Sequence, residues 1–411
     1  MASVTVFGAH GSTVSLSYDS AQNALLAQQI AGAFSAAVSG GTVQPADSKY
    51  GPPPPLAPGA TGEFVASTNS VTFLPHGYTD VVNAAAAAVV FGSGGANQQI
   101  LSGSGNLSFV TTEGNGTVVA GGGNNQIVVA AGDSGGWQID TGNGNDMIRA
   151  LGAGNDTIAA GGGNNYLQLG AGKDQIITQG ADTILGGTGA ETVVASATGG
   201  QHATDLIYGN ASMLFLVAAN GATVLGGSGS DTVYGGTGPD LLYGGTAGSN
   251  FLQAGSGAAT LFGGGNNDQL YAGGSAAQAL HAATGNESLF GGGASGQDTF
   301  YTGSGADQVT GSGGQSTFVF GTGAATVTAL PSSSFQAVFE AIKGQAGGTD
   351  LVQGLTNASQ LQVVLSGYGP NEAASALAGQ TTNGSSVTIT LSDNTQITFA
   401  NIAHLTTSNF S

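Results

Sequence analysis

The sequence predicts an all-β fold: a parallel β-roll, or β-solenoid, of coils of about 18 residues with structured flanks. Three observations support this prediction. A nine-residue unit is written twice in succession at 226–243, as GGSGSDTVY and GGTGPDLLY. Looser copies of the unit run from about residue 92 to residue 330. Glycine makes up 75 of the 411 residues, without the strict three-residue period of collagen.

Each copy of the unit joins a Gly/Asn/Asp turn to a short strand with one or two large apolar residues, as in LGAGNDTIA and GGGNNDQLY. Two units make one coil of about 18 residues: a turn, a strand, the opposite turn and the opposite strand. Stacked coils then form two parallel sheets with turns aligned in columns along both edges. Glycine suits the turns because it accepts positive φ and lets the next coil approach closely. The apolar residue of each strand should point between the sheets.

Outside the repeat, the N-terminal part of the chain has a different texture. Residues 1–91 are expected to form a small α+β region, with two short strands and then a helix that ends near Val38. Asp19 or Ser20 is suited to cap that helix. The helix packs either on its own strands or on another subunit. Prolines concentrate at 45–62, which predicts an extended connector or an exposed loop.

The remaining chain divides into the roll, 92–330, and a β-rich C-terminal region, 331–411. Within the latter, Phe335, Val338, Phe339 and Ile342 have helical spacing. Residues 386–402 alternate polar and apolar side chains, which predicts a β-hairpin. The C-terminal region is therefore expected to act as a cap of the roll.

Composition excludes several partners. The chain has 23 acidic residues against four Lys and Arg, for a net charge of −19. Nucleic acid and anionic membranes need a basic footprint, so neither is expected, whereas divalent cations suit this balance. No apolar run approaches the roughly 18 residues of a membrane span, so no membrane insertion is expected. The N-terminus lacks the basic and apolar regions of a Sec signal, and there is no cysteine.

The sixth place of the unit is often acidic. An Asp there, together with carbonyl groups of the Gly-rich turn, would form an oxygen cage for Ca²⁺ between two stacked turns. Such a site needs acids on the same edge, about 18 residues apart. One edge carries Asp156, Asp174 and Glu191, and further on Asp231, Asn250, Asp268, Glu287 and Asp307. The opposite turns carry Asp146, Asn165 and Asp182, and further on Asp240, Ala259, Ala277 and Asp298.

Calcium is therefore expected mainly along the first of these edges, and the best pairs are Asp156 with Asp174 and Asp268 with Glu287. Elsewhere Asn side chains should form hydrogen-bonded ladders, or the turn binds nothing. Asp231 and Asp240 lie on opposite edges and cannot share an ion, although their motif is the most regular. The candidate calcium ligands are Asp146, Asp156, Asp174, Glu191, Asp231, Asp240, Asp268, Glu287, Asp298 and Asp307.

The unit G-G-x-G-x-D-x-U-x, matched in full at Gly226–Tyr243, resembles the RTX family of calcium-binding β-roll proteins exported by type I secretion. The looser resemblance covers about 92–330. It implies Ca²⁺ as cofactor, an extracellular or cell-surface location, and an uncleaved export signal in the C-terminal region. Extracellular calcium modules bind with roughly 10⁻⁴–10⁻³ M affinity, which would leave the chain loose in the cytosol and let it fold after export.

Catalytic motifs are missing from the sequence, so an enzyme is not expected. There is no HExxH, and no G-x-S-x-G turn is followed by an Asp and a His. The five histidines lack ligand spacing and are expected at the surface or in turns. Trp137 is expected to pack in the core or at an edge, with a sugar-binding platform as the alternative.

The leading hypothesis is a secreted calcium-binding structural protein that self-assembles into an extracellular filament, surface layer or biofilm matrix. A roll has two ends of unpaired strand edge, which must be covered or paired. The flanks either cap their own roll or join the next molecule. One alternative is an adhesin that binds polysaccharide or a cell surface; another, with little room for a catalytic domain, is a polysaccharide-modifying enzyme. The aromatic column that suggests an adhesin comprises Tyr208, Tyr234, Tyr243, Phe262, Tyr271 and Phe290.

Overall fold

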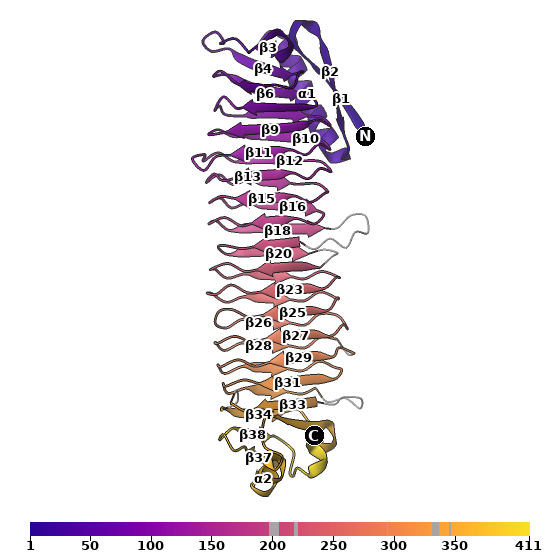
Figure 1. Ribbon diagram of the computed structural model, residues 1–411, viewed down its shortest axis with the longest axis vertical. Helices are drawn as coiled ribbons and strands as arrows, with labels where there is room; N and C mark the ends of the chain where they lie inside the picture. Colours follow the sequence, from indigo (N-terminus) through magenta and orange to yellow (C-terminus); the bar gives the residue numbers. More distant parts are fainter. Residues whose placement is uncertain (197–204, 218–220, 294, 331–336, 345–346) are drawn as a thin grey trace. The chain divides into compact units, whose positions relative to one another are not determined.

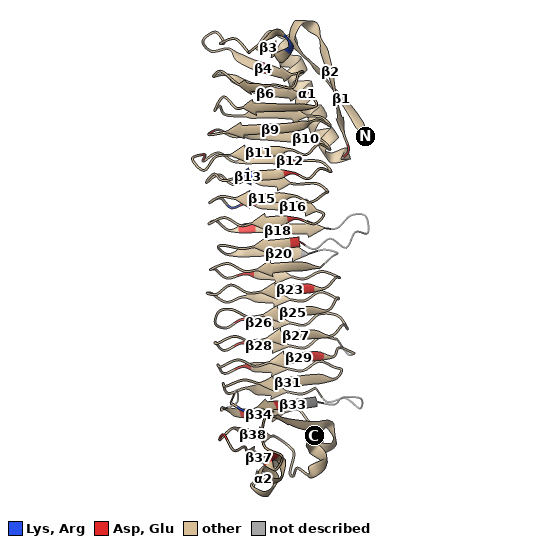
Figure 2. Ribbon diagram, viewed as in Figure 1, with Lys and Arg blue, Asp and Glu red and all other residues tan. Residues whose placement is uncertain are grey.

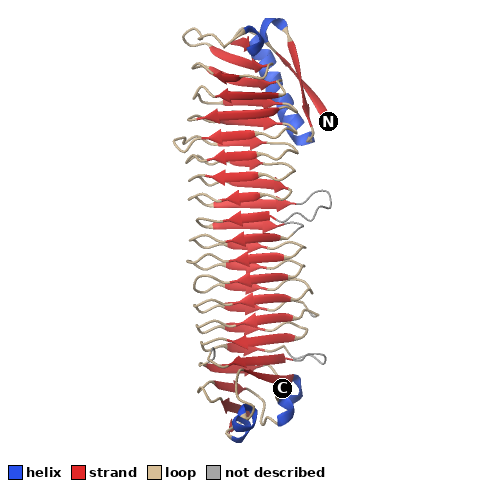
Figure 3. Cartoon of the chain, viewed as in Figure 1, coloured by secondary structure: helices blue, strands red, loops and turns tan. Residues whose placement is uncertain are grey.

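The computed structural model describes the whole chain except residues 197–204, 218–220, 294, 331–336 and 345–346. The chain divides into two compact units, Met1–Ala211 and Ser212–Ser411. In each unit, successive strands alternate between two parallel sheets (Figures 1 and 3). We call these the even sheet and the odd sheet after the numbers of most of their strands. The exception is β3, which belongs to the even sheet because it pairs with β4. The predicted fold class, a parallel β-solenoid, is confirmed.

The first unit has both sheets in continuous parallel pairing. Its even sheet comprises β3 (Val43–Asp47), β4 (Thr61–Ala66), β6 (Tyr78–Asn83), β8 (Gln98–Ser102), β10 (Gly116–Ala120), β12 (Trp137–Asp140), β14 (Thr157–Ala159), β16 (Gln175–Gln179) and β18 (Glu191–Ser196). Its odd sheet comprises β5 (Val71–Phe73), β7 (Ala87–Phe91), β9 (Asn106–Thr111), β11 (Gln126–Val129), β13 (Met147–Ala150), β15 (Tyr166–Leu169), β17 (Thr183–Leu185) and β19 (Asp205–Tyr208).

The second unit repeats this arrangement. Its even sheet comprises β20 (Met213–Val217), β22 (Thr232–Tyr234), β24 (Phe251–Gln253), β26 (Gln269–Tyr271), β28 (Ser288–Phe290), β30 (Gln308–Thr310), β32 (Thr326–Thr328), β34 (Thr349–Gln353) and β38 (Gln396–Phe399). Its odd sheet comprises β21 (Ala222–Leu225), β23 (Asp240–Tyr243), β25 (Ala259–Phe262), β27 (Gln278–His281), β29 (Asp298–Tyr301), β31 (Ser316–Phe320), β33 (Ala337–Ile342) and β35 (Leu361–Ser366).

The core of each unit is a stack of inward-pointing side chains, one from each strand. Strand burial alternates with period 2, as in Gln126–Val129, because successive side chains point to opposite faces. In the second unit, the even-sheet members of the stack are at most 1% exposed: Phe215, Val233, Leu252, Leu270, Leu289, Val309, Val327 and Val352. Register keeps them aligned from coil to coil, so each apolar side chain packs on its equivalent above and below.

Glycine in the turns is required mainly by the neighbouring coil. A Cβ atom placed on Gly172 would overlap the carbonyl oxygen of Gly154, and one on Gly305 would overlap that of Gly285. Neither Gly172 nor Gly305 has positive φ, in contrast to Gly163 at 112°. Close approach of stacked turns therefore explains more of the glycine content than backbone conformation does.

The N-terminal residues form a layer beside the first unit's roll, which we call the N-terminal layer. It consists of the antiparallel pair β1 (Ala2–Phe7) and β2 (Thr13–Tyr18), joined by a 3-10 turn at Ala9–Gly11, and the helix α1 (Ala21–Ser39). The backbone N–H of Asn23 donates to the hydroxyl of Ser20, so of the two caps that the sequence offered, Asp19 and Ser20, the N-cap is Ser20. The helix packs on its own chain: Ala27, Ala31 and Phe34 belong to one core with even-sheet residues such as Val65.

The proline-rich stretch lies between two strands of the even sheet. Within 45–62, the first residues belong to β3 and the last to β4, which pair in parallel. The loop between them carries a 3-10 turn at Ser48–Tyr50, and its Pro54 carbonyl accepts the hydroxyl of Tyr78. The parallel pairing of the roll therefore begins at β3, before residue 92.

The C-terminal end combines a continuation of the roll with an antiparallel hairpin. The hairpin predicted for 386–402 is present: β37 (Ser386–Thr390) pairs with β38, and β36 (Thr381–Asn383) extends it. The helix α2 (Glu372–Ala378) and 3-10 turns at Ala358–Gln360 and Thr407–Asn409 complete this end. None of the described helices is long and apolar enough to cross a membrane.

The spacing of apolar residues at 335–342 predicts a helix, and this prediction is wrong for the residues that the structure describes. Ala337–Ile342 is strand β33, and Phe335 lies outside the described residues. Phe339 is fully buried and stacks on Phe318 of the neighbouring strand, with ring centroids 5.0 Å apart. Packing in the inward stack therefore overrides the local spacing.

Leu270 tests the inward stack. Leu270→Ala leaves a cavity that the neighbouring coils cannot close, so we expect the free energy of unfolding to fall by about 2–5 kcal/mol. Equilibrium urea denaturation of the full chain measures this. Gln269→Ala, at an exposed position on the same strand, is the matched control and should change stability by about 0.5 kcal/mol or less. Equal losses in the two variants would contradict the packing described.

Candidate calcium-binding turns

All ten acids predicted as ligands lie in turn columns, at or just before the first residue of a strand, and each is 5% exposed or less. We call turns that lead into even strands even turns, and those that lead into odd strands odd turns. Figure 2 shows acidic residues along the turns that flank the strands. Buried carboxylates are rare unless they are hydrogen-bonded, paired or bound to metal, so each needs an explanation.

Strand register aligns the acids largely as expected. In the first unit, Asp156, Asp174 and Glu191 stand in one even column, since the residues that follow them pair directly. The second unit aligns Asp231, Asn250, Asp268, Glu287 and Asp307 in the same way. The expected place of Ala277 is wrong: Ala259 pairs with Gln278, one residue later.

In these columns, one carboxylate oxygen of an acid typically accepts a backbone N–H from the preceding coil and so links two coils. The backbone N–H of Asp156 donates to Oδ1 of Asp174 at 2.9 Å, and that of Glu287 donates to Oδ1 of Asp307 at 3.0 Å. In an odd column, the N–H of Asn165 donates to Oδ1 of Asp182 at 2.8 Å. Hydrogen bonds to charged acceptors contribute about 1.5–3 kcal/mol each. These side chains therefore join coils independently of any metal.

Four of the ten predicted acids have both oxygens satisfied by N–H donors, and one of them is Asp307, which accepts from Glu287 and from Gly303. Asp231 accepts from Met213 and, through its second oxygen, from Gly227 of its own turn. Asp240 is held in the same manner. Asp268 accepts four bonds, two at each oxygen, which fills its four lone-pair directions. Asp231 and Asp240 belong to the most regular copies of the unit, so the best motif builds turns that are already satisfied.

Other acids lack donors, and these fit a cation best. Both carboxylate oxygens of Glu287 are buried without a hydrogen-bond partner. Burial, the adjacent carboxyl of Asp307 and the charge of Asp268 raise the pKa of Glu287 to about 8. A calcium ion, which takes six to eight oxygen ligands, would relieve this crowding of negative charge.

Asp174 is a further acid that lacks a donor, and it lies next to Asp156 in its column. Burial raises the pKa of Asp156 to about 7; a hydrogen bond from the Trp137 backbone lowers it, and the charges of Asp174 and Asp133 raise it. Oδ2 of Asp174 is buried without a partner. Among the described residues, no three acidic or histidine side chains converge as a metal cluster. Carbonyl groups of the turns would therefore have to supply most of the calcium ligands, both at Glu287 and at Asp174.

Asn and Gln side chains occupy several places where the unit would have an acid. The amide nitrogen of Asn250 donates to the Gly245 carbonyl and to Oδ1 of Asp268. That of Gln278 donates to three glycine carbonyls, of Gly255, Gly257 and Gly273, at 2.9–3.2 Å. The amide N–H groups thus bind the same kind of oxygen that a calcium ion would. The predicted Asn ladders are present, and they join coils without metal.

Segments of the chain match the family model of the RTX calcium-binding nonapeptide repeat (4 copies), at residues 110–133, 140–176, 178–197, 225–246, 245–276 and 281–318. No curated protein and no solved structure matched the chain. The matched segments contain Asp174 and Glu287, the acids with buried oxygens that lack donors, together with their neighbours Asp156 and Asp307. The chain is an RTX β-roll protein. Its repeats are of the calcium-binding type, and the donor-poor carboxylates are where the residues present best fit the ion.

Sequence reasoning missed three acids of this RTX β-roll that belong to turn columns. Asp205 follows Asp182 in an odd column, and Asp350 follows Ala325 in an even one, at spacings of 23 and 25 residues. Insertions lengthen both coils, so a period of about 18 residues passes over these positions. Asp133 accepts the indole N–H of Trp137 and two backbone N–H groups. Its unit, AGDSGGWQI, departs too far from the motif to be recognised.

Trp137 does not form the exposed platform that a sugar would need. Trp137 is 2% exposed, so the platform alternative is wrong. On the odd sheet of the second unit, Tyr243, Phe262, His281 and Tyr301 stack at centroid distances of 4.0–4.5 Å. Stacking covers the ring faces that sugars pack against. His281 lies inside this column, on a strand, rather than in a turn.

A substitution at Gln278 tests whether its amide group takes the place of a calcium ion. Gln278→Glu places a carboxylate against three carbonyl oxygens, so we expect a loss of about 3 kcal/mol or more in chelator. Calcium should restore most of that loss, because the new oxygens complete a cage. Urea denaturation in EGTA and in calcium measures both. Gln297→Glu, exposed in the next odd turn, is the control and should show neither effect. A loss that calcium leaves unchanged would contradict the interpretation.

Glu287 tests the electrostatics of the underdonated turns. Its pKa is raised from 4.5 to about 8. Between those values the folded chain retains a proton that the unfolded chain releases, so the metal-free protein should lose stability as pH rises from 4.5 through 8. Glu287→Gln should flatten this dependence, and calcium should flatten it in the wild type. Urea denaturation at several pH values in EGTA measures it, with exposed Glu113→Gln as the control. An unchanged slope in Glu287→Gln would refute the assignment.

Proposed function

We propose that this RTX β-roll protein is a secreted, calcium-binding structural protein that self-assembles into an extracellular filament, surface layer or biofilm matrix. The observation that supports assembly is the free edge of β5, the first strand of the odd sheet. β5 pairs with β7, and no other described strand pairs with it. Open strand edges attract further strands.

The side chains of β5 favour association as well. Val71 is 65% exposed and Phe73 is 70% exposed, and the Phe73 ring stacks on Phe91 at 4.3 Å. Large exposed apolar residues at one place on a soluble protein mark an interaction surface. By contrast, β3, the first strand of the even sheet, carries Pro45, which lacks an N–H and protects an edge from pairing. The odd edge is therefore the one suited to a second copy of the chain.

Calcium and secretion enter the proposal through the repeats. A chain with a net charge of −19 repels its own copies, and bound calcium reduces that repulsion. The underdonated turns are the places where the ion would act. In a calcium-poor cytosol these carboxylates would keep the turns loose, and in an exterior with millimolar calcium they would close, which supports type I export before folding.

Electron microscopy and light scattering of the full chain, in calcium and in EGTA, test the proposal. We expect elongated or sheet-like assemblies in calcium. Phe73→Lys should reduce them strongly, because a lysine at the β5 edge disfavours strand pairing. Leu25→Lys, which replaces an equally exposed apolar residue of α1 at 61% exposure, should assemble as the wild type does. Monodisperse monomers in both conditions at high concentration would overturn the proposal.

A further inference from the structure

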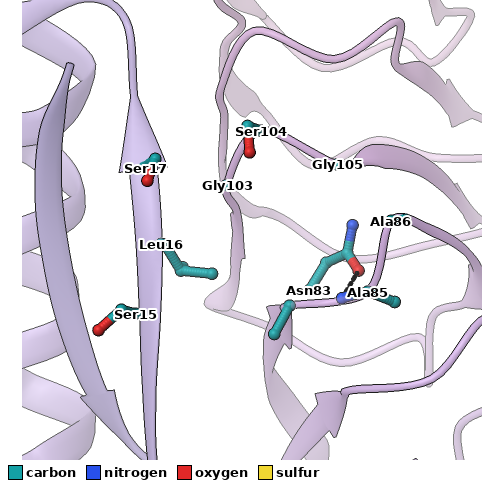
Figure 4. Close-up of a pocket in the computed structure, with 10 residues that line it drawn as sticks. Ser15, Leu16, Ser17, Asn83, Ala85, Ala86, Gly103, Ser104 and Gly105 are labelled. Carbon is teal, nitrogen blue, oxygen red and sulfur yellow. Dashed lines mark hydrogen bonds between the residues drawn. The ribbon is translucent and has the colours of Figure 1, made fainter.

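The strand β2 of the N-terminal layer runs along the odd turns of the first unit. Figure 4 shows Leu16 of β2 pointing toward the turns that contain Asn83–Ala86 and Gly103–Gly105, and the strand and these turns line a groove of about 330 Å³. Contact becomes tight at the glycines. A Cβ atom on Gly103 would meet the Ser17 nitrogen at 3.1 Å. The strand therefore follows a column of odd turns closely.

Asp19, just beyond β2, enters that same column. A Cβ atom on Gly122 would meet Asp19 Oδ2 at 2.8 Å, and one on Gly142 would meet Asp19 Oδ1 at 2.5 Å. The backbone N–H of Asn143 donates to Asp19 Oδ2 at 2.8 Å. Next to it, the side-chain amide of Asn23 donates to the carbonyls of residues 120 and 141. The carboxylate thus lies between the glycine turns of two successive coils.

Three oxygen atoms at this place are buried without a hydrogen-bond partner: Asp19 Oδ1, Asp146 Oδ2 and Thr141 Oγ1. Asp146 and Thr141 are each 2% exposed. The hydroxyl of Thr141 is close enough to the Asp146 carboxylate to lower its pKa. Burial raises the pKa of Asp146 to about 6, the hydrogen bonds from Asn125 and the nearby Thr141 hydroxyl oppose that rise, and the negative charge of Asp19 adds to it.

Asp146 has no acid next to it in its own column. Its neighbours there are Asn125 and Asn165. The backbone N–H and the side-chain amide of Asn125 both donate to Asp146 Oδ1. The repeat therefore leaves Oδ2 of Asp146 without the second carboxylate that a site between two turns requires. Asp19, which is more than 120 residues away in sequence by the numbering, supplies that carboxylate from outside the roll.

We propose that Asp19, Thr141 and Asp146 bind one Ca²⁺ ion that fastens the N-terminal layer to the roll. The donors are all oxygen, which suits calcium better than transition metals. Calcium accepts six to eight ligands in flexible geometry, so turn carbonyls and water complete the set. The N-terminus of α1 carries about +0.5 charge, which opposes a cation, but the two carboxylates carry a combined charge of about −2 and outweigh it.

The alternative is that Asp19 only caps the turn through its hydrogen bond to Asn143. Asp19→Asn separates the two roles, because the amide oxygen still accepts that bond while the charge is lost. Isothermal titration of the full chain with CaCl₂ should then show one ion fewer than the wild type, or at least a tenfold weaker site. Limited proteolysis should show that calcium no longer protects the N-terminal layer.

A double variant sharpens the test. Asp19→Asn with Asp146→Asn should lose no more calcium than either single variant, since both residues hold the same ion. Exposed Glu113→Gln, which removes one charge elsewhere in the first unit, should bind as the wild type does. Circular dichroism in EGTA confirms that each variant folds. Unchanged calcium stoichiometry and affinity in Asp19→Asn, or additive losses in the double variant, would overturn the proposal.

Discussion

The bond on which the rest of this structure depends joins the N–H at the start of one strand to a side-chain oxygen one coil later. It recurs in both units, with carboxylate acceptors at Asp174 and Asp307 and amide acceptors at Asn165 and Asn250. Turns have few apolar contacts, so without this bond their buried polar groups would be unsatisfied. It also explains the close stacking of turns, which in turn requires glycine.

Because this bond needs only an oxygen, it sets no requirement for calcium. We therefore expect the calcium affinity of each turn to depend on what the other carboxylate oxygen meets. Where two glycine N–H groups point inward, as at Asp268, the oxygen is already satisfied. Where donors are missing, as at Glu287, negative charge remains uncompensated in a buried place, and an ion or a proton is favoured. A family match alone does not separate these two kinds of turn.

The ends of the chain follow a different logic. The N-terminal layer covers even-sheet strands with α1 and lies against odd turns through β2, so one side of the roll's beginning is protected. The odd edge at β5 is left with exposed Val71 and Phe73. At the other end, the antiparallel hairpin β36–β38 follows the last parallel strands. The proposed assembly rests on this free edge at β5 rather than on the repeat itself.

The sequence by itself determined the repeat, the parallel solenoid, the N-terminal helix, and the columns of aligned acids. These follow from periodicity, which is local. It did not determine Phe339 as a strand residue, because the inward aromatic stack decides that position. Nor did it show that Asp268 is saturated while Glu287 is not, since this depends on which way turn N–H groups point. Asp19 beside Asp146 is the clearest case: only tertiary packing brings an acid from outside the repeat into a turn, and no spacing in the sequence encodes that approach.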